Sequence, residues 1–176
     1  MNATLTDETV KHRSLGLTAA DAVWVATATL HKRYPDAIRF TTDEIAEEVK
    51  LQNLTDAKDQ TVLQHIRQHC VANRPPQPNR YRMLYALGRG DRRLFLPWDK
   101  EDDGRRNAPT KPDIQSLPPT LQPLLQWYEE WIEQHRPKHV EQDPLLALIG
   151  SGKHLWKDES GDEFLARLRS NWGGVD

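Results

Sequence analysis

Six polar residues near the middle of the chain have the types and spacing needed to read nucleic acid. Gln and Arg side chains form paired hydrogen bonds with base edges, Thr offers a hydroxyl and a methyl group, and Lys neutralises phosphate. Gln64 and Arg67 stand at helical spacing, so a helix over this segment would turn both to one face. The candidate contacts are Lys58, Gln60, Thr61, Gln64, Arg67 and Gln68.

A second group of cations follows at the tip of a predicted hairpin, where Arg89, Arg92 and Arg93 stand in or beside the turn at 88–91. These arginines would reach neighbouring phosphate or a minor groove. Residues 58–93 contain eight basic and two acidic residues, whereas the whole chain has a net charge of -2. The contrast favours a local anionic partner, although a basic face that is merely solvated remains an alternative.

A metal site is the next candidate, because His65 and His69 stand at i, i+4 on the same predicted helix, with Cys70 adjacent. Zinc needs three or four ligands, and the sequence offers no third ligand at a matched position. His69 and Cys70 are neighbours and cannot share a helix face. We therefore predict a histidine packing pair and no metal.

Residues 150–153, Gly-Ser-Gly-Lys, have the composition of a phosphate-binding loop. That motif needs an earlier glycine and a Ser or Thr after the lysine, but Ala147 and His154 occupy those positions. No Ser-His-Asp order and no paired-carboxylate pattern points to catalysis either. The sequence therefore predicts a protein that is not an enzyme and holds no cofactor.

Composition narrows the class of protein further. The chain has 176 residues, of which 37% are hydrophobic, and its single cysteine excludes an internal disulfide framework. No apolar run approaches the length of a membrane span, and the polar N-terminal residues have no signal-peptide core. We expect a cytoplasmic protein without a membrane partner, associated with the nucleoid if it binds DNA.

Local signals predict an α+β fold that is mainly helical. Thr18 with Asp21, and Thr41 with Glu44, have the spacing of helix-capping pairs, and Glu48 is expected to face water on the second helix. The remaining predicted elements are a short strand at 38–40, a helix at 58–72 and a hairpin with strands at 81–87 and 93–96.

The same signals divide the chain into five parts. Residues 98–119 are charged and rich in proline, which is typical of a linker. The predicted parts are a disordered N-terminus at 1–16, a folded domain at 17–97, the linker at 98–119, an amphipathic helix at 120–136 and a partner-binding tail at 143–176.

The order helix, strand, helix, helix, hairpin resembles the winged helix-turn-helix fold. Residues 64–97 also resemble an uncharacterised bacterial winged-helix DNA-binding family. The resemblance implies the fold, with residues 58–72 as the helix that enters the major groove of double-stranded DNA. It supplies no activity.

Residues 143–172 resemble the C-terminal tails of small type II antitoxins of the VapB and Phd-like kinds. In that family the tail wraps a toxin, so the resemblance implies that Arg167 or Arg169 enters an acidic metal-binding site of the toxin. The head departs from the pattern, because most such antitoxins carry smaller DNA-binding domains. The implied partner contacts are Leu145, Leu148, Trp156, Phe164, Arg167, Leu168, Arg169 and Trp172. A tail that packs back on the helix at 120–136 is the alternative.

Taken together, the sequence predicts a DNA-binding regulator, antitoxin-like, that represses its own operon and binds a partner through its tail. A winged-helix adaptor for protein contacts remains an alternative, as does a non-catalytic accessory subunit of a nuclease or defence system. The sequence leaves open the target site, the partner and whether the chain forms a homodimer.

Overall fold

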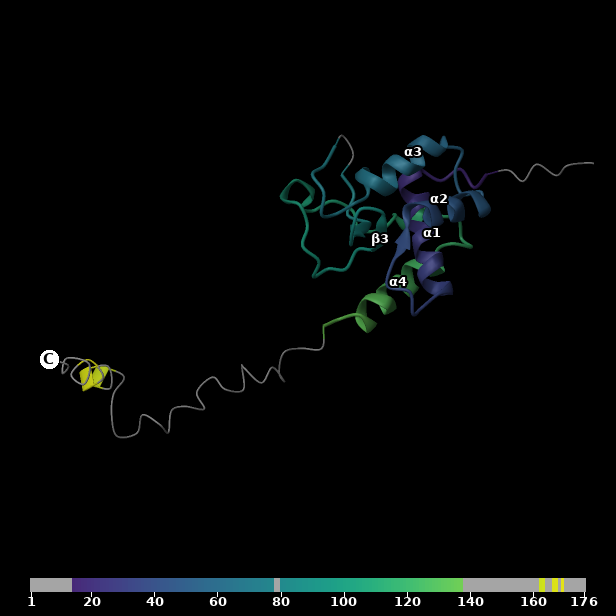
Figure 1. The fold of residues 1–176 in the computed structure, drawn as a ribbon. Coiled ribbons are helices and arrows are strands. Elements are labelled where there is room, and N and C mark those ends of the chain that lie inside the picture. The colour runs from purple at the N-terminus through teal and green to yellow at the C-terminus, as the bar shows by residue number, and fades with distance from the viewer. Residues whose placement is uncertain (1–13, 78–79, 138–161, 164–165, 168, 170–176) are drawn as a thin grey trace, which may run out of the picture. The chain divides into compact units, whose positions relative to one another are not determined.

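The structure is a computed structural model that describes residues 14–77, 80–137, 162–163, 166–167 and 169. The chain divides into two units, Met1–His135 and Arg136–Asp176. The first, which we call the N-terminal unit, is an α+β arrangement of helices and a small antiparallel sheet (Figure 1). Within the described residues no helix is long and apolar enough to cross a membrane.

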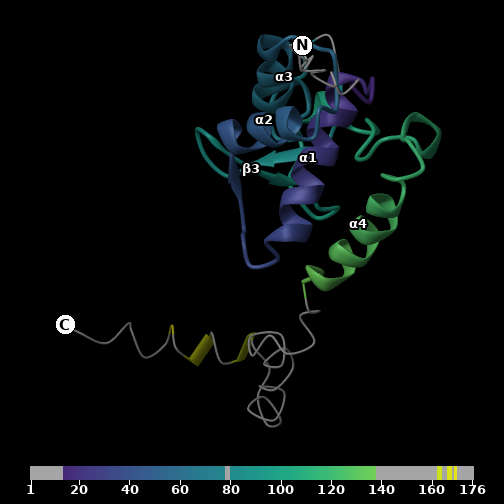
Figure 2. The same cartoon turned by 90° about the vertical axis from the view of Figure 1, so that its right-hand side faces the viewer.

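Helix α1, Ala19–Arg33, is the centre of the N-terminal unit (Figure 2). The Thr18 hydroxyl accepts a hydrogen bond from the backbone N–H of Asp21, which caps the helix as the sequence predicts. The helix ends at Tyr34, because the residue before a proline avoids helical geometry. Most of its residues are buried, including the wholly enclosed Trp24. A helix enclosed on nearly all sides must be covered by the other elements.

Helix α2, Thr42–Leu51, begins with the predicted capping box between Thr41 and Glu44. The prediction that Glu48 faces water is wrong, because its side chain is only 3% exposed. Its carboxylate accepts two hydrogen bonds from the Arg33 guanidinium, at 2.8 and 2.9 Å. This paired contact joins α2 to the last turn of α1.

Helix α3, Asp59–Gln64, continues without a break into a π-helical turn, η1, His65–His69. The Cys70 N–H donates to the carbonyl of His65, five residues back, at 3.0 Å. The helical segment is therefore shorter than the predicted 58–72. Its C-terminal residues are rotated by the wider turn relative to an α-helix.

The sheet has three short antiparallel strands in the order β1-β3-β2. They are β1 at Phe40–Thr41, β2 at Leu84–Ala86 and β3 at Asp91–Leu94. Leu84 pairs with Leu94 and Phe40 pairs with Arg92. The hairpin is thus present at the predicted place, but its first strand is shorter than the predicted 81–87 and its second strand begins two residues earlier than the predicted 93–96.

Residues 98–119 are not the separate linker that their composition predicts. They include two 3₁₀ turns, η2 at Asp103–Arg105 and η3 at Ile114–Ser116. The side chains of Arg105 and Leu117 are buried, and the Arg82 N–H donates to the Pro109 carbonyl at 2.7 Å. The segment therefore belongs to the N-terminal unit.

Helix α4, Pro123–Gln134, also belongs to this unit rather than standing alone. Its predicted apolar stripe packs against α1, with Trp24 and Tyr128 in an edge-to-face contact at 5.5 Å. The Tyr128 hydroxyl donates to the Phe95 carbonyl at 2.6 Å, which is the partner a buried phenol requires. The predicted boundary between the folded domain and the helix at 120–136 is therefore wrong.

Candidate nucleic-acid interface

The outer face of α3 carries the predicted base-reading side chains. Gln60, Thr61, Gln64 and Arg67 are all exposed, and Lys58 is exposed just before the helix. The opposite side of the helix is buried and includes Val62 and Ile66. We call the exposed set Gln60, Thr61, Gln64 and Arg67 the α3 face. Its side chains can act together on one ligand.

Gln68, predicted to extend this face, is turned partly inward. It is half-buried, and its Nε2 donates to the carbonyl of Pro75 at 2.7 Å. The π-helical turn and this hydrogen bond direct Gln68 to the proline-rich loop after η1. It holds that loop instead of adding to the exposed surface.

Arg92 corrects the prediction of an arginine-rich exposed tip. Arg92 is 0% exposed, because β3 directs its side chain toward η1. The guanidinium donates to the Ile66 carbonyl at 2.9 Å and to the Gly88 carbonyl at 3.2 Å. It also lies 3.5 Å from the carbonyl of Arg67. Arg92 cannot contact a nucleic acid in this structure.

The hydrogen bonds of Arg92 connect the helix to the turn of the hairpin. The carbonyls of Gly88 and Ile66 accept hydrogen bonds from the same guanidinium, so the backbone next to the exposed Arg89 is linked to the backbone next to Arg67. Burial, followed by the charges of Arg74 and Arg67, lowers the pKa of Arg92 to about 10. The side chain therefore stays charged at neutral pH. The hairpin turn and the helical segment that bears Arg67 are therefore joined through the Arg92 side chain.

Arg93, the third predicted tip residue, is paired within the unit. Its side chain is 14% exposed and makes two hydrogen bonds to the Asp99 carboxylate, at 2.6 and 2.7 Å. The guanidinium also lies 4.7 Å from the centre of the Tyr85 ring. Of the three predicted arginines, only Arg89 is exposed.

Arg105 is a structural residue whose role neither spacing nor composition indicates in the sequence. Its guanidinium is 0% exposed and makes five hydrogen bonds, all of them to backbone carbonyls. The acceptors are the carbonyls of Gln68, His69, Arg74, Pro75 and Tyr81. Carbonyls at the end of a helix lack intrahelical partners, and a cation there is favourable. Burial lowers the pKa of Arg105.

Gly104 allows Arg105 to reach these carbonyls. A Cβ atom at residue 104 would lie 2.7 Å from Cγ of Pro76. Only glycine permits such an approach between the η2 turn and the proline-rich loop without a shift of one of them. Arg92 and Arg105 together occupy the carbonyls of residues 66–69, which we call the carbonyl end of η1.

His65 and His69 form the predicted packing pair. Both residues are buried, and their rings meet edge-to-face at 4.9 Å. The π-helical turn also places Cys70 Sγ 3.5 Å from His65 Nδ1. Burial and the neighbouring His69 lower the pKa of His65 to about 4, and burial lowers that of His69. Within the described residues no three His, Cys, Asp or Glu side chains are placed to hold a metal ion.

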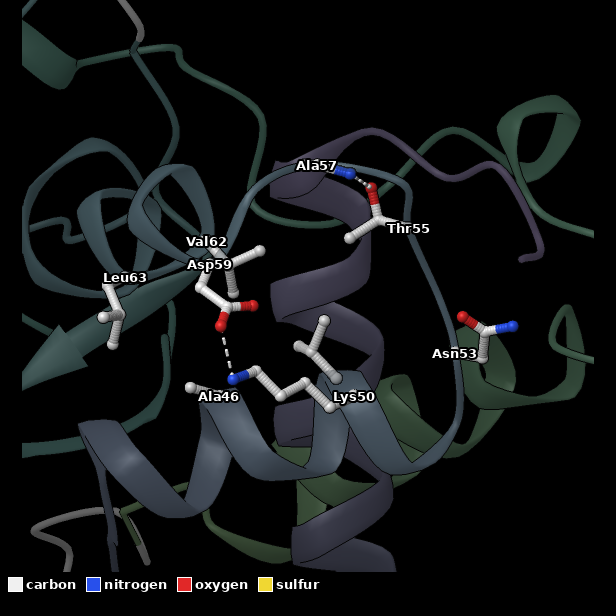
Figure 3. A pocket seen from close by; sticks show the side chains of 9 residues that line it. Ala46, Lys50, Asn53, Thr55, Ala57, Asp59, Val62 and Leu63 are labelled. Carbon is white, nitrogen blue, oxygen red and sulfur yellow. Dashed lines mark hydrogen bonds and ion pairs between the residues drawn. The ribbon is translucent and has the colours of Figure 1, made fainter. Parts of the chain in front are cut away.

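A cavity of about 270 Å³ separates α2 from α3 under the turn that joins them (Figure 3). Ala46 and Val62 lie on its apolar walls. Lys50 Nζ donates to Asp59 Oδ2 at 2.6 Å and so links the end of α2 to the start of α3. Thr55 supports the turn by accepting from the Ala57 N–H. These contacts help to set the position of the α3 face.

The predicted partner contacts of the tail fall mostly outside the described residues. Arg167 and Arg169 are described, and both are exposed on helical backbone. The predicted contacts outside the described residues are Leu145, Leu148, Trp156, Phe164, Leu168 and Trp172. The N-terminal segment 1–13 and the glycine-rich segment 150–153 also lie outside them.

The chain matches no protein-family model, no curated protein and no solved structure. The case for a function therefore depends on the geometry and chemistry of its own residues.

Proposed function

We propose that the N-terminal unit contains a winged helix-turn-helix that binds double-stranded DNA. In this proposal the α3 face enters the major groove, and Arg89 contacts phosphate beside it. The order α1, β1, α2, α3, β2, β3 supports this fold, because a helix pair is followed by a hairpin that joins the first strand in one sheet.

The chemistry of the α3 face supports sequence-specific contacts. Amide and guanidinium groups can pair with base edges, and a helix is the element that fits the major groove. Gln64, the last residue of α3, and Arg67, in the π-helical turn that follows, are both exposed. A basic surface without amides would favour phosphate contacts alone, whereas this surface offers both kinds of contact.

The observation that carries the proposal is the buried Arg92. By bonding the carbonyls of Ile66 and Gly88 at once, it joins the turn that bears Arg89 to the helix that bears Arg67. A surface used only for solubility does not need its charges fixed relative to one another. A rigid arrangement favours nucleic-acid binding, because base and phosphate contacts must be made in register.

The test is a selection from random DNA duplexes, followed by fluorescence anisotropy at several salt concentrations. We expect enrichment of a defined sequence and an affinity that falls as salt rises, because phosphate contacts release counterions. The absence of enrichment together with no binding to any duplex at low salt would favour the adaptor or accessory-subunit alternative.

We further propose that residues 143–176 capture a protein partner, as the antitoxin resemblance implies. The boundary of the N-terminal unit at His135 supports a separable tail. Truncation after Gln142 should leave folding and DNA affinity unchanged but abolish partner capture from the native cell. If the partner is a toxin, Arg167→Glu should also weaken its neutralisation. Unfolding of the truncated chain would contradict this part of the proposal.

A further inference from the structure

A second surface lies on the other side of α2 from α3. A groove of about 480 Å³ runs between the last turn of α1 and α2. Leu30 and Phe40 line it and are almost fully buried, each 6% exposed. On its rim, Tyr34 and Leu51 are 52% and 73% exposed. The groove thus combines an apolar floor with large apolar side chains that have not been covered.

The residues that line this groove include three carboxylates and one cation, Arg33. Arg39, which pairs with Asp91, also acts on Glu44. Arg33 pairs with Glu48, so that pair contributes no net charge. Glu44 and Glu47 remain on the α2 side of the groove. Hydrogen bonds from the backbone and side chain of Thr41 lower the pKa of Glu44, which therefore stays ionised at neutral pH. A cationic partner would gain from these two carboxylates.

We propose that this α1–α2 groove docks a basic amphipathic helix of a partner protein. The apolar side chains of such a helix, spaced at i, i+3 and i+4, would lie over Leu30, Phe40 and Leu51, with flanking Lys or Arg residues near Glu44 and Glu47. Helix α2 has ten residues and is about 15 Å long, which matches two to three turns of a partner helix.

The groove and the α3 face use different sides of α2. Lys50 extends to Asp59 on the α3 side, whereas Glu47 and Leu51 line the groove on the α1 side. Opposite charges on the two surfaces keep their ligands distinct. The N-terminal unit can therefore hold DNA and a protein helix at the same time.

The test uses a fluorescent peptide of 14 residues with Leu at i, i+3 and i+4 positions and Lys elsewhere, titrated with the full chain. A matched peptide with Glu in place of Lys is the control for charge. We expect saturable binding of the basic peptide and none of the acidic one. Glu47→Lys should weaken binding about tenfold, since reversing one charge changes the pairing by about 1.4 kcal/mol.

The variant Asp43→Lys makes the same charge change on an exposed position of α2 that does not line the groove, and it should weaken binding less than twofold. Leu51→Asp should weaken binding at least as much as Glu47→Lys. Equal effects of Asp43→Lys and Glu47→Lys, or equal binding of the two peptides, would overturn the proposal. It would also be overturned if sedimentation showed a dimer of the chain that Leu51→Asp dissociates, because the groove would then hold a second copy.

Discussion

Arg67 and Arg105 are two cations at the helical segment formed by α3 and η1, and they differ in exposure and in partners. Arg67 projects into solvent from the α3 face, while the guanidinium of Arg105 is enclosed and bonded to the carbonyl end of η1. Arg67 is available to an external anion, whereas the N–H donors of Arg105 are already bonded to backbone carbonyls. A charged residue near a candidate binding helix therefore indicates either a ligand contact or an internal support, and burial distinguishes them.

Several cations of the basic segment 58–93 are likewise buried or paired within the protein. Arg92 is buried, Arg93 pairs with Asp99, and Arg82 pairs with Glu101. The exposed cations that remain in this segment include Lys58, Arg67 and Arg89. Fewer cations are thus available to a ligand than the count of basic residues predicts. They include residues of the α3 face and of the adjoining turn.

The largest effect on stability should come from replacing the buried Arg105. Arg105→Met keeps an apolar stem but removes five donors. The half-buried carbonyls of Arg74 and Tyr81 would lose the donor that Arg105 supplies, whereas those of Gln68, His69 and Pro75 also accept from another group. We expect the free energy of unfolding to fall by about 2–6 kcal/mol, because two carbonyls lose their donor and each unsatisfied group costs about 1–3 kcal/mol. Urea unfolding followed by circular dichroism measures this loss.

Arg106→Met is the matched control for Arg105→Met. Arg106 is the next residue, but its side chain is 70% exposed and pairs only with Asp103. Its replacement should change the free energy of unfolding by less than about 0.5 kcal/mol. Equal losses for the two variants would mean that the carbonyl contacts of Arg105 do not stabilise the unit.

The second largest effect should be a loss of stability in acid. The pKa values of His31 and His65 are both lowered to about 4, by burial first and then by a neighbouring histidine, which is His135 for His31 and His69 for His65. Between pH 6.5 and 4 the unfolded chain binds more protons at these sites than the folded one, so stability falls as pH falls. Each site should account for a loss of up to about 3 kcal/mol by pH 4.

The variant His65→Gln isolates one of these sites, because Gln does not titrate. The slope of unfolding free energy against pH should be shallower in this variant between pH 6.5 and 4. An identical slope in the variant and the original chain would show that His65 does not resist protonation in the fold.

Local features of the fold are predictable from the sequence, and distant ones are not. Thr18 with Asp21, and Thr41 with Glu44, act within one helical turn, so their spacing alone predicts the caps. The roles of Glu48 and Arg105 depend on acceptors or donors far along the chain. Spacing and composition contain no signal for them.

The candidate site shows the same division. The exposure of Gln60, Thr61 and Gln64 follows from the helical periodicity that the structure keeps to the end of α3, and Arg67 is also exposed although it lies in the π-helical turn. The inward turn of Gln68 depends on a π-helical turn that periodicity does not reveal. Arg92 alternates with its neighbours on a strand, but its direction is set by the register of β3 with β1.

Smaller effects, on DNA affinity, are expected from substitutions on the exposed α3 face. Gln64→Ala and Arg67→Ala should each weaken binding to a selected duplex by about 1–3 kcal/mol and relax the preference at one base pair. Fluorescence anisotropy against the selected site and its single-base variants measures both effects. Gln134→Ala, on the exposed end of α4, is the control and should leave affinity unchanged.

The smallest effect is expected at the hairpin turn. Arg89→Ala should weaken binding by a similar factor for every duplex, because a phosphate contact contains no base information. The slope of log affinity against log salt should also become shallower by about one unit. A loss confined to one sequence would instead place Arg89 in contact with a base.

Nuclear magnetic resonance mapping with a selected duplex tests the central claim most directly. With ¹⁵N-labelled protein, we expect the largest amide shifts at residues 59–68 and 88–90, with little change along α4. Shifts that are absent from the α3 face, or that concentrate on α4 or the α1–α2 groove, would contradict the assignment of this face to DNA.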